Sequence, residues 1–448
     1  MLKAMQVDEQ NQIEMIKGEL TGQILKGRYL IGRHIDNGSF GQVHKIIDLQ
    51  DKTRPLVIKI SADYKLFGKE INAMKKAYKK TSDFVGKDQS CSIPEVVEYG
   101  MIIQSSQNLQ SNEEPVLMSY MIMPRFGSNL ENYFEKQSCK MTNKSILNFG
   151  ICMLKLIEGI HSAGFTYNDL KLDNVLVGFQ NKIQSNKPNC FEDCSLHLVD
   201  FGFATRFIDK KTRKHIDEQE IGTFRGNMIF ASMNQLDFQM TSRRDDLISL
   251  CYLLIYLLNN GNLKGIDLSQ NLSRNESFNL VKKAKSKYSV KDFCCDNASK
   301  ITSFVEAIFK LSFKETPDYK LLTEMLKSGL TPLAEKRLLK MRIVEDSGSD
   351  SSVEAVENFE TSTDNGTSYK LSGATSNDLD MEDYACSANT VNVPNPMVRT
   401  NSYKKLQHIF NNHKNINQLS DVKVPTKHQT HTDQSDSVIK KLQGLFTK

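Results

Sequence analysis

Residues able to transfer a phosphoryl group lie close together in the middle of the chain. The stretch 165–178, FTYNDLKLDNVLVG, places Asp169, Lys171 and Asn174 at the spacing D-x-K-x-x-N. A second carboxylate follows at Asp200, in the tripeptide DFG. In such a set one carboxylate orients a hydroxyl and the ammonium neutralises phosphate charge, while the carboxamide and the second carboxylate hold Mg²⁺. The pattern therefore predicts phosphoryl transfer that depends on a divalent cation.

The surrounding sequence argues against a chance match in a polar loop. Residues 145–161 have apolar positions at helical spacing, and Gly164 is a stop signal for that helix. The apolar run Val175–Val177 predicts a short strand directly after the D-x-K-x-x-N spacing. A helix, a polar loop and a strand in this order would hold Asp169 and its neighbours in one place. With these elements the chain resembles a eukaryotic protein kinase.

A second part of that resemblance is a loop at residues 35–43, IDNGSFGQV. It is similar to the kinase loop G-x-G-x-x-G-x-V, in which glycines let backbone N–H groups approach the phosphates of ATP. Asp36 departs from the pattern because it replaces the first glycine. The ATP-binding residues that the resemblance implies are Ile35, Gly38, Ser39, Phe40, Gly41, Val43, Val57, Lys59, Glu70, Met123 and Phe126.

Lys59 ends a strand-like stretch, LVIK, that resembles the V-A-I-K strand of kinases. The resemblance implies that Lys59 contacts the phosphates and forms an ion pair with a glutamate on the next helix. Glu70 is the only carboxylate between residues 64 and 80, so we expect it to be that partner. Further along, Met123 would border the adenine pocket, and residues 124–127 would form the hinge.

Four later stretches narrow the resemblance to the casein kinase 1 group, including its vaccinia-related and tubulin-kinase branches. They are DKKTRKHI at 209–216, IFASMN at 229–234, TSRRDDLISLCYLLI at 241–255 and LSFKETPDYKLL at 311–322. IFASMN is similar to the R-Y-A-S-I-N of that family, and the third stretch to its S-R-R-D-D-L. The residues that would support the site are Phe201, Gly202, Arg243, Arg244 and Asp246, the last by binding the backbone of the catalytic loop.

Two departures from the family bear on regulation and specificity. Asn168 stands where many kinases have an arginine that binds a phosphorylated activation loop. We therefore hypothesise that activity does not require phosphorylation within residues 203–230. Ile229 replaces the arginine that helps to build the family's anion pocket, so a preference for phosphorylated substrates stays open.

The resemblance and the order of elements predict an α+β, two-lobed protein kinase fold. A small, mainly antiparallel β N-lobe with one helix would occupy about residues 24–123, and a larger, mainly α-helical C-lobe residues 128–330. We expect a leader with a loose helical pattern over 1–23 and a low-complexity, largely disordered tail over 331–448.

Composition excludes several other classes of protein. A net charge of +5 over 448 residues gives no indication of a dedicated nucleic-acid binder. The nine cysteines include no pair of CxxC motifs, which argues against a zinc site. Scattered cysteines of this kind are read as reduced thiols, which predicts a cytoplasmic or nuclear protein. The longest apolar run, LISLCYLLIYLL at 247–258, is too short to cross a bilayer and predicts a buried helix.

The tail contains a repeated pattern, KKLQHIF at 404–410 and KKLQGLF at 440–446. It is either a coincidence of biased composition or a duplicated motif that docks on a partner or on the kinase domain. Serines among acidic residues at 347–352 would suit self-phosphorylation. We otherwise expect a monomer that binds ATP and protein substrates.

The sequence thus predicts an ATP- and Mg²⁺-dependent Ser/Thr protein kinase of casein kinase 1 type, with Asp169 as catalytic base. The alternative is a kinase-fold scaffold with weak turnover, for which Asp36, Pro124 and Asn168 argue. Phosphotransfer to a small molecule is a third reading, which the protein-kinase activation segment disfavours.

Overall fold

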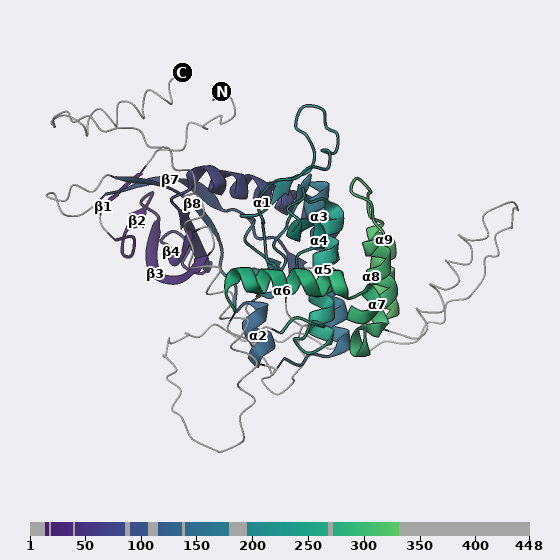
Figure 1. The fold of residues 1–448 in the computed structure, drawn as a ribbon. Helices are drawn as coiled ribbons and strands as arrows, with labels where there is room; N and C mark the ends of the chain where they lie inside the picture. Colours follow the sequence, from purple (N-terminus) through teal and green to yellow (C-terminus); the bar gives the residue numbers. More distant parts are fainter. Residues whose placement is uncertain are drawn as a thin grey trace, which may run out of the picture. The chain divides into compact units, whose positions relative to one another are not determined.

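The computed structural model describes residues 14–17, 19–38, 41–85, 90–105, 115–136, 139–178, 195–267 and 272–330. Within these ranges the chain forms a strand-rich N-lobe and a helical C-lobe, as the sequence predicts (Figure 1). Ser39 and Phe40 of the predicted phosphate loop lie outside the described residues, and so does the tail over 331–448 with its repeated pattern.

The N-lobe is built on a seven-stranded sheet in the order β1-β7-β8-β5-β4-β3-β2. All neighbouring strands are antiparallel except β1 and β7, which are parallel. One face of the sheet packs alternate apolar residues such as Ile31, Ile46 and Ile58 into a core. The strands are β1 (Glu14–Lys17), β2 (Ile24–Leu25), β3 (Tyr29–Gly38), β4 (Gly41–Asp48), β5 (Leu56–Ser61), β7 (Glu98–Ser105) and β8 (Val116–Pro124).

The sheet begins earlier in the chain than the sequence predicts. Strand β1 lies inside the segment predicted to be a helical leader, and it pairs with residues 102–105 of β7. Ile16 and Leu20, both buried, join the core of the sheet. A four-residue strand in a polar segment is too short to show a period of two, so its apolar pattern does not separate it from a helix.

Helix α1 (Tyr64–Val85) joins the sheet to the C-lobe. It buries one face, which includes Phe67, Met74 and the carboxylate of Glu70. Near its end it packs closely on the long C-lobe helix α3 (Asn143–Ser162). A Cβ on Gly159 of α3 would lie only 2.4 Å from Thr81 Oγ1 of α1, so the close approach requires glycine there.

The C-lobe is organised around α5 (Arg243–Leu258), in which every residue from Asp245 to Leu258 is buried. Such a helix, apolar on all sides, belongs in a core, and this confirms the prediction for 247–258. None of the helices in the described ranges has the length and apolar character needed to cross a membrane. The other helices are α2 (Leu130–Lys136), α4 (Met233–Leu236), α6 (Arg274–Lys287), α7 (Val290–Phe293), α8 (Thr302–Phe309) and α9 (Tyr319–Ser328), with 3₁₀ turns η1 (Leu172–Asn174) and η2 (Asp296–Ile301).

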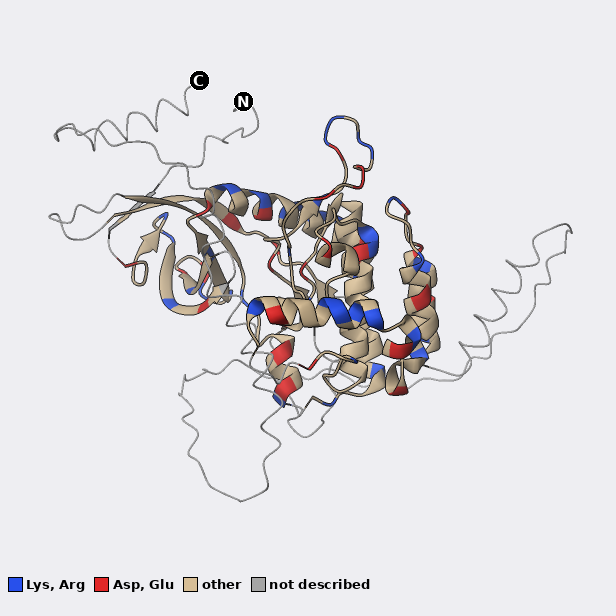
Figure 2. Cartoon of the chain, in the orientation of Figure 1, with Lys and Arg blue, Asp and Glu red and all other residues tan. Residues whose placement is uncertain are grey.

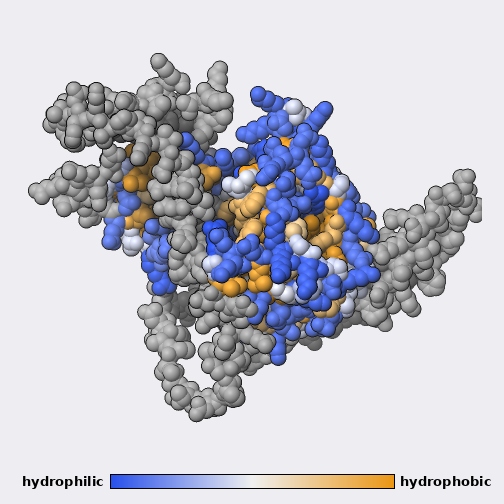
Figure 3. Space-filling view, in the orientation of Figure 1, coloured by the Kyte–Doolittle hydropathy of each residue, from blue (hydrophilic) through white to orange (hydrophobic). Residues whose placement is uncertain are grey.

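Charged side chains occur on helices of both lobes. Helices α1, α6 and α9 each carry lysine and glutamate residues (Figure 2). The described part of the face in view is mostly hydrophilic, and hydrophobic residues show in places between the hydrophilic ones (Figure 3). This distribution is typical of a folded domain with a polar surface and an apolar interior.

Short strands position the segments around the D-x-K-x-x-N spacing. One small sheet has the order β10-β11-β6, and a two-stranded ribbon pairs β12 with β9. The strands are β6 (Cys91–Ser92), β9 (Phe165–Thr166), β10 (Val175–Val177), β11 (Leu196–Leu198) and β12 (Thr205–Arg206). The catalytic loop therefore leaves β9 and enters β10, while the DFG tripeptide lies between β11 and β12.

Substitution of Ile16 tests whether β1 belongs to the folded domain. Ile16 is 4% exposed, so Ile16→Ala should lower the free energy of unfolding by about 2–4 kcal/mol. The matched control is Ile24→Ala in β2 of the same sheet. Ile24 is 53% exposed, and its substitution should change stability by less than about 0.5 kcal/mol. Urea denaturation measures both, and equal losses would contradict a structural role for β1.

Candidate active site

A buried carboxylate in the first turn of α5 fixes the backbone of the catalytic loop. Asp246 Oδ2 accepts a hydrogen bond from Tyr167 N and Oδ1 accepts one from Asn168 N, each at 2.7 Å. His161 Nε2 lies 2.8 Å from Asp246 Oδ2. These bonds hold Asn168 in the left-handed conformation, with φ 71°, which asparagine tolerates better than most residues.

The three residues of the D-x-K-x-x-N spacing lie together in the structure. Asn174 Nδ2 donates to the backbone oxygen and to Oδ2 of Asp169, both at 2.9 Å. Lys171 Nζ lies 3.3 Å from the same Asp169 Oδ2. The 3₁₀ turn η1 brings Asn174 back onto Asp169. Burial raises the pKa of Asp169, although Lys171 opposes the shift.

Lys59 joins the two lobes through two carboxylates. Its Nζ lies 2.7 Å from Glu70 Oε1 on α1 and 3.1 Å from Asp200 Oδ1 of the DFG tripeptide. Burial raises the pKa of Glu70 against the influence of Lys59. Burial also opposes ionisation of Asp200, but Lys59 and Lys171 outweigh it and lower the pKa of Asp200. The predicted ion pair is thus present and extends to a third charge.

The second face of the N-lobe sheet carries the predicted nucleotide-binding residues. The strand register places Val43 opposite Lys59 and Val57 opposite Met123. Ile35 is an exposed apolar residue at the end of β3. Gly38 and Gly41 pair at the turn between β3 and β4.

Glycine is required at position 41 of this turn. A Cβ on Gly41 would lie 2.2 Å from Ile60 O, so a larger residue would displace β5, the strand that carries Lys59.

The hinge residue Phe126 packs toward the C-lobe. Its ring stacks on His197 of β11, with centroids 3.7 Å apart and planes 15° apart. Both ring nitrogens of His197 are bonded, since Ser92 Oγ and Ser195 Oγ each lie 2.8 Å away. Burial lowers the pKa of His197 to about 4, so the ring is neutral near pH 7. The backbone hydrogen bond from Gly127 N to Val177 O, 2.8 Å, ties the same hinge to β10.

The predicted supporting residues fall into two groups. Phe201 packs edge-on against Tyr167, and Gly202 N donates to Asp200 Oδ1 at 3.3 Å, so these two hold the DFG tripeptide. Arg243 donates to the backbone oxygens of residues 314 and 315, and Arg244 donates to Glu218 at 2.6 Å. Arg243 therefore ties the loop before α9 to α5, and Arg244 ties the segment after β12 to the same helix.

The chain matches the protein kinase domain family over residues 29–332. It belongs to the protein kinase family. Within that family it is similar to casein kinase I homologues, which confirms the resemblance seen in the sequence. The casein kinase I homolog RAG8 of Kluyveromyces lactis is 27% identical over 310 residues, which cover 69% of this chain and 52% of that protein.

Two relatives from Saccharomyces cerevisiae show the same level of similarity. Casein kinase I homolog 1 is 29% identical over 221 residues, covering 49% of this chain and 39% of the relative. Casein kinase I homolog 2 is 26% identical over 309 residues, covering 68% and 50%. The chain thus spans about half the length, or less, of the curated relatives it matches.

The kinase offers oxygen ligands that fit Mg²⁺. Because Asn174 Nδ2 is directed at Asp169, the carboxamide oxygen of Asn174 is directed elsewhere. The side chain of Asp200 is 15% exposed and so accessible to an ion. The described residues contain no group of three or more His, Cys, Asp or Glu that would hold a metal. A carboxylate and a carboxamide alone suit Mg²⁺, which keeps water and phosphate oxygens as its other ligands.

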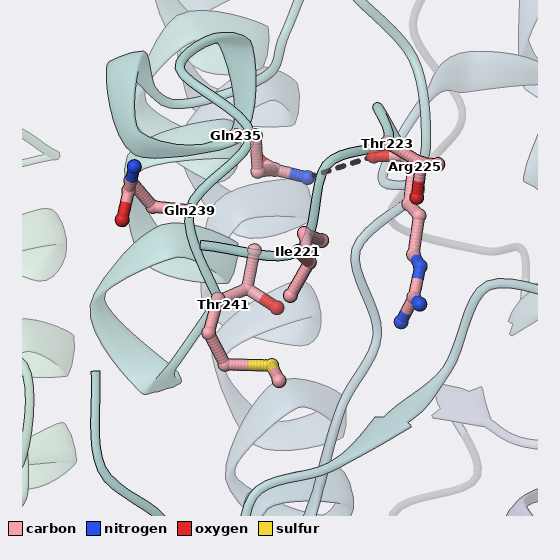
Figure 4. Close-up of a pocket in the computed structure, with 7 residues that line it drawn as sticks. Ile221, Thr223, Arg225, Gln235, Gln239 and Thr241 are labelled. Carbon is pink, nitrogen blue, oxygen red and sulfur yellow. Dashed lines mark hydrogen bonds between the residues drawn. The ribbon is translucent and has the colours of Figure 1, made fainter. Parts of the chain in front are cut away.

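The structure also describes the segment around Ile229, in which the family's anion pocket is expected. Ile229 is 3% exposed and belongs to the core. A small pocket of about 10 Å³ is lined by residues that precede and follow Ile229 in the chain, and Gln235 Nε2 bonds to the backbone oxygen of Arg225 there (Figure 4). Its lining residues are Ile221, Thr223, Arg225, Gln235, Gln239, Met240 and Thr241. Arg225 is therefore the one cation of this lining.

Sequence reasoning missed several residues of the kinase site. Asp245, adjacent to Asp246, accepts hydrogen bonds from Ser232 Oγ at 2.7 Å, from Asn234 Nδ2 at 2.9 Å and from Ser242 N at 2.8 Å. It therefore fixes the segment before α4. The spacing from Ser242 to Asp245 is that of a capping box, which is a signal available in the sequence. His197 and Gln235 carry no comparable signal.

Gly226 tests how closely the activation segment approaches the catalytic loop. It has φ 102°, and a Cβ there would lie 2.1 Å from Asn168 O. Gly226→Ala should therefore lower the free energy of unfolding by roughly 3 kcal/mol and reduce turnover. The matched control is Gly222→Ala, with φ 66° and no atom within 4 Å of the added Cβ, which should cost about 1 kcal/mol. Thermal unfolding compares them, and the same loss in both would contradict the close approach.

Proposed function

We propose that the protein is an ATP-dependent Ser/Thr protein kinase of casein kinase 1 type. The observation that carries the proposal is the position of Lys59 Nζ, within 3.1 Å of both Glu70 and Asp200. This arrangement joins β5, α1 and the DFG tripeptide in the way that phosphate positioning requires. The similarity to casein kinase I homologues supports serine and threonine as the acceptors.

In this proposal each buried charge has one task. Asp169, held by Asn174 and Lys171, orients the acceptor hydroxyl and takes its proton. Lys171 and Lys59 neutralise phosphate charge, and Asn174 and Asp200 would hold Mg²⁺. The bound ion supplies electrostatic stabilisation of the phosphates. Because the chemistry needs little covalent participation by the protein, positioning provides most of the rate.

The proposal is tested by Asp169→Asn in a phosphotransfer assay with Mg-ATP and casein. The variant keeps the size of the side chain but removes the base, so kcat should fall by at least about 100-fold. Asp237→Asn is the matched control. Asp237 pairs with Lys282 at the protein surface, and its loss should leave kcat unchanged. Equal incorporation of phosphate by wild type and Asp169→Asn would instead favour a scaffold that binds partners.

The pH dependence of the reaction follows from the burial of Asp169. The base must be ionised, and burial raises its pKa above the ordinary aspartate value. Activity should therefore be lost as the pH falls through this raised pKa, and the acid limb of kcat/KM should lie above pH 4. Steady-state rates between pH 4 and 8 measure the limb, with ATP affinity measured separately at each pH. A limb at or below pH 4 would contradict the assignment.

A further inference from the structure

Asn168 contacts both ends of the segment that runs from the DFG tripeptide to the start of α4. Its Nδ2 donates to Phe203 O at 2.9 Å and to Thr205 Oγ1 at 3.1 Å. Its backbone oxygen accepts from Gln235 Nε2 at 3.1 Å, and the same Nε2 lies 3.3 Å from Arg225 O. One buried residue of the catalytic loop is thus bonded, directly or through Gln235, to the beginning and the end of this segment.

The contact at the beginning of the segment bears on the metal ligand. Phe203 and Thr205 follow Asp200 closely in the chain, and Thr205 pairs with Thr166 in the β9–β12 ribbon. Thr166 Oγ1 donates to Thr205 O, and Thr205 Oγ1 donates to Phe203 O, both at 3.2 Å. Because Asn168 directly precedes the base Asp169, these bonds fix the position of Asp200 relative to the base.

All the groups that Asn168 binds in this segment are uncharged. In kinases regulated by phosphorylation, an arginine at this place binds the phosphate of the activation segment. A buried cation without that phosphate would lack a counter-charge, which is costly. Asn168 Oδ1 has no hydrogen-bond partner among the described residues, so the carboxamide serves as a donor only. The donor groups are satisfied without a phosphate.

We propose that Asn168 is a positioning residue that clamps both ends of segment 203–226 against the catalytic loop in the unphosphorylated protein. Its effect on turnover rests on the proposed kinase function, whereas the clamp is a property of the fold. The clamp keeps Asp200 and Asp169 in register, a task that a phosphate and an arginine perform in other kinases.

Asn168→Asp removes the donor with little change in shape, and aspartate also tolerates the left-handed conformation. The carboxylate would face Phe203 O instead of bonding to it. In dephosphorylated protein, kcat for casein should fall at least about tenfold, which is the loss of one to two hydrogen bonds. The KM for ATP should stay within about twofold, because the Lys59–Glu70 pair is untouched. Unchanged kcat, or a rise in KM alone, would overturn the proposal.

Thr205 supplies a matched pair of variants. Thr205→Val keeps the shape but removes the acceptor hydroxyl, so kcat should fall by a factor of about three to ten. Thr205→Ser should recover most of that loss. The loss in Asn168→Asp combined with Thr205→Val should be clearly smaller than the product of the two single losses, because both changes remove the Asn168–Thr205 bond, although Thr205→Val also removes the bond to Phe203 O. Losses that multiply would show that the two residues act separately and would overturn the clamp.

The rate of amide hydrogen exchange in the dephosphorylated protein tests the clamp independently of catalysis. Residues 203–207 should exchange slowly in the wild type and at least about tenfold faster in Asn168→Asp. Equal exchange in both overturns the inference, whatever the activity. An inactive wild type with the expected exchange difference refutes the proposed function and leaves the clamp intact. If phosphatase treatment abolished the activity of the wild type and rephosphorylation within residues 203–230 restored it, the clamp alone would be refuted.

Discussion

The carboxylate of Asp246, buried at the start of α5, determines where the catalytic loop runs. Moving such a charge out of water costs several kcal/mol, and hydrogen-bond donors must offset this cost. Here they are two backbone N–H groups of the loop and the ring of His161. The N-terminus of α5 also favours a negative charge. Because the two N–H groups belong to the residues just before Asp169, the hydrogen bonds to Asp246 also fix the position of Asp169.

A second constraint connects the lobes. Lys59 comes from β5, Glu70 from α1 and Asp200 from the C-lobe, so their contacts form only when all three elements are in place. Two carboxylates around one ammonium leave an excess of negative charge, which a cation bound at Asp200 would offset. Glu70 and Thr81 both belong to α1, so the helix that carries the partner of Lys59 also packs on α3 at Gly159.

Local patterns predicted the parts of this structure that depend on nearby residues. The D-x-K-x-x-N spacing, the LVIK strand and the apolar run at 247–258 each predict elements that the structure contains. Strand β1 was missed because four residues carry too little periodicity, and its pairing with β7 is a long-range contact. The need for glycine at 226 was missed for a similar reason. It arises from the approach of Asn168 O, which no local pattern records.

The contacts that Asn168 makes with the segment after the DFG tripeptide differ from those of the charged residues beside it, because they involve uncharged groups. Asn168, Thr205 and Gln235, which connect the catalytic loop to the segment after the DFG tripeptide, are neutral. A neutral donor has a modest net effect on stability but costs little to bury when paired. A cation in the same place would be tolerable only with an anion beside it. With asparagine at position 168, the catalytic loop contributes no buried cation of its own to this contact, so the contact itself needs no phosphate.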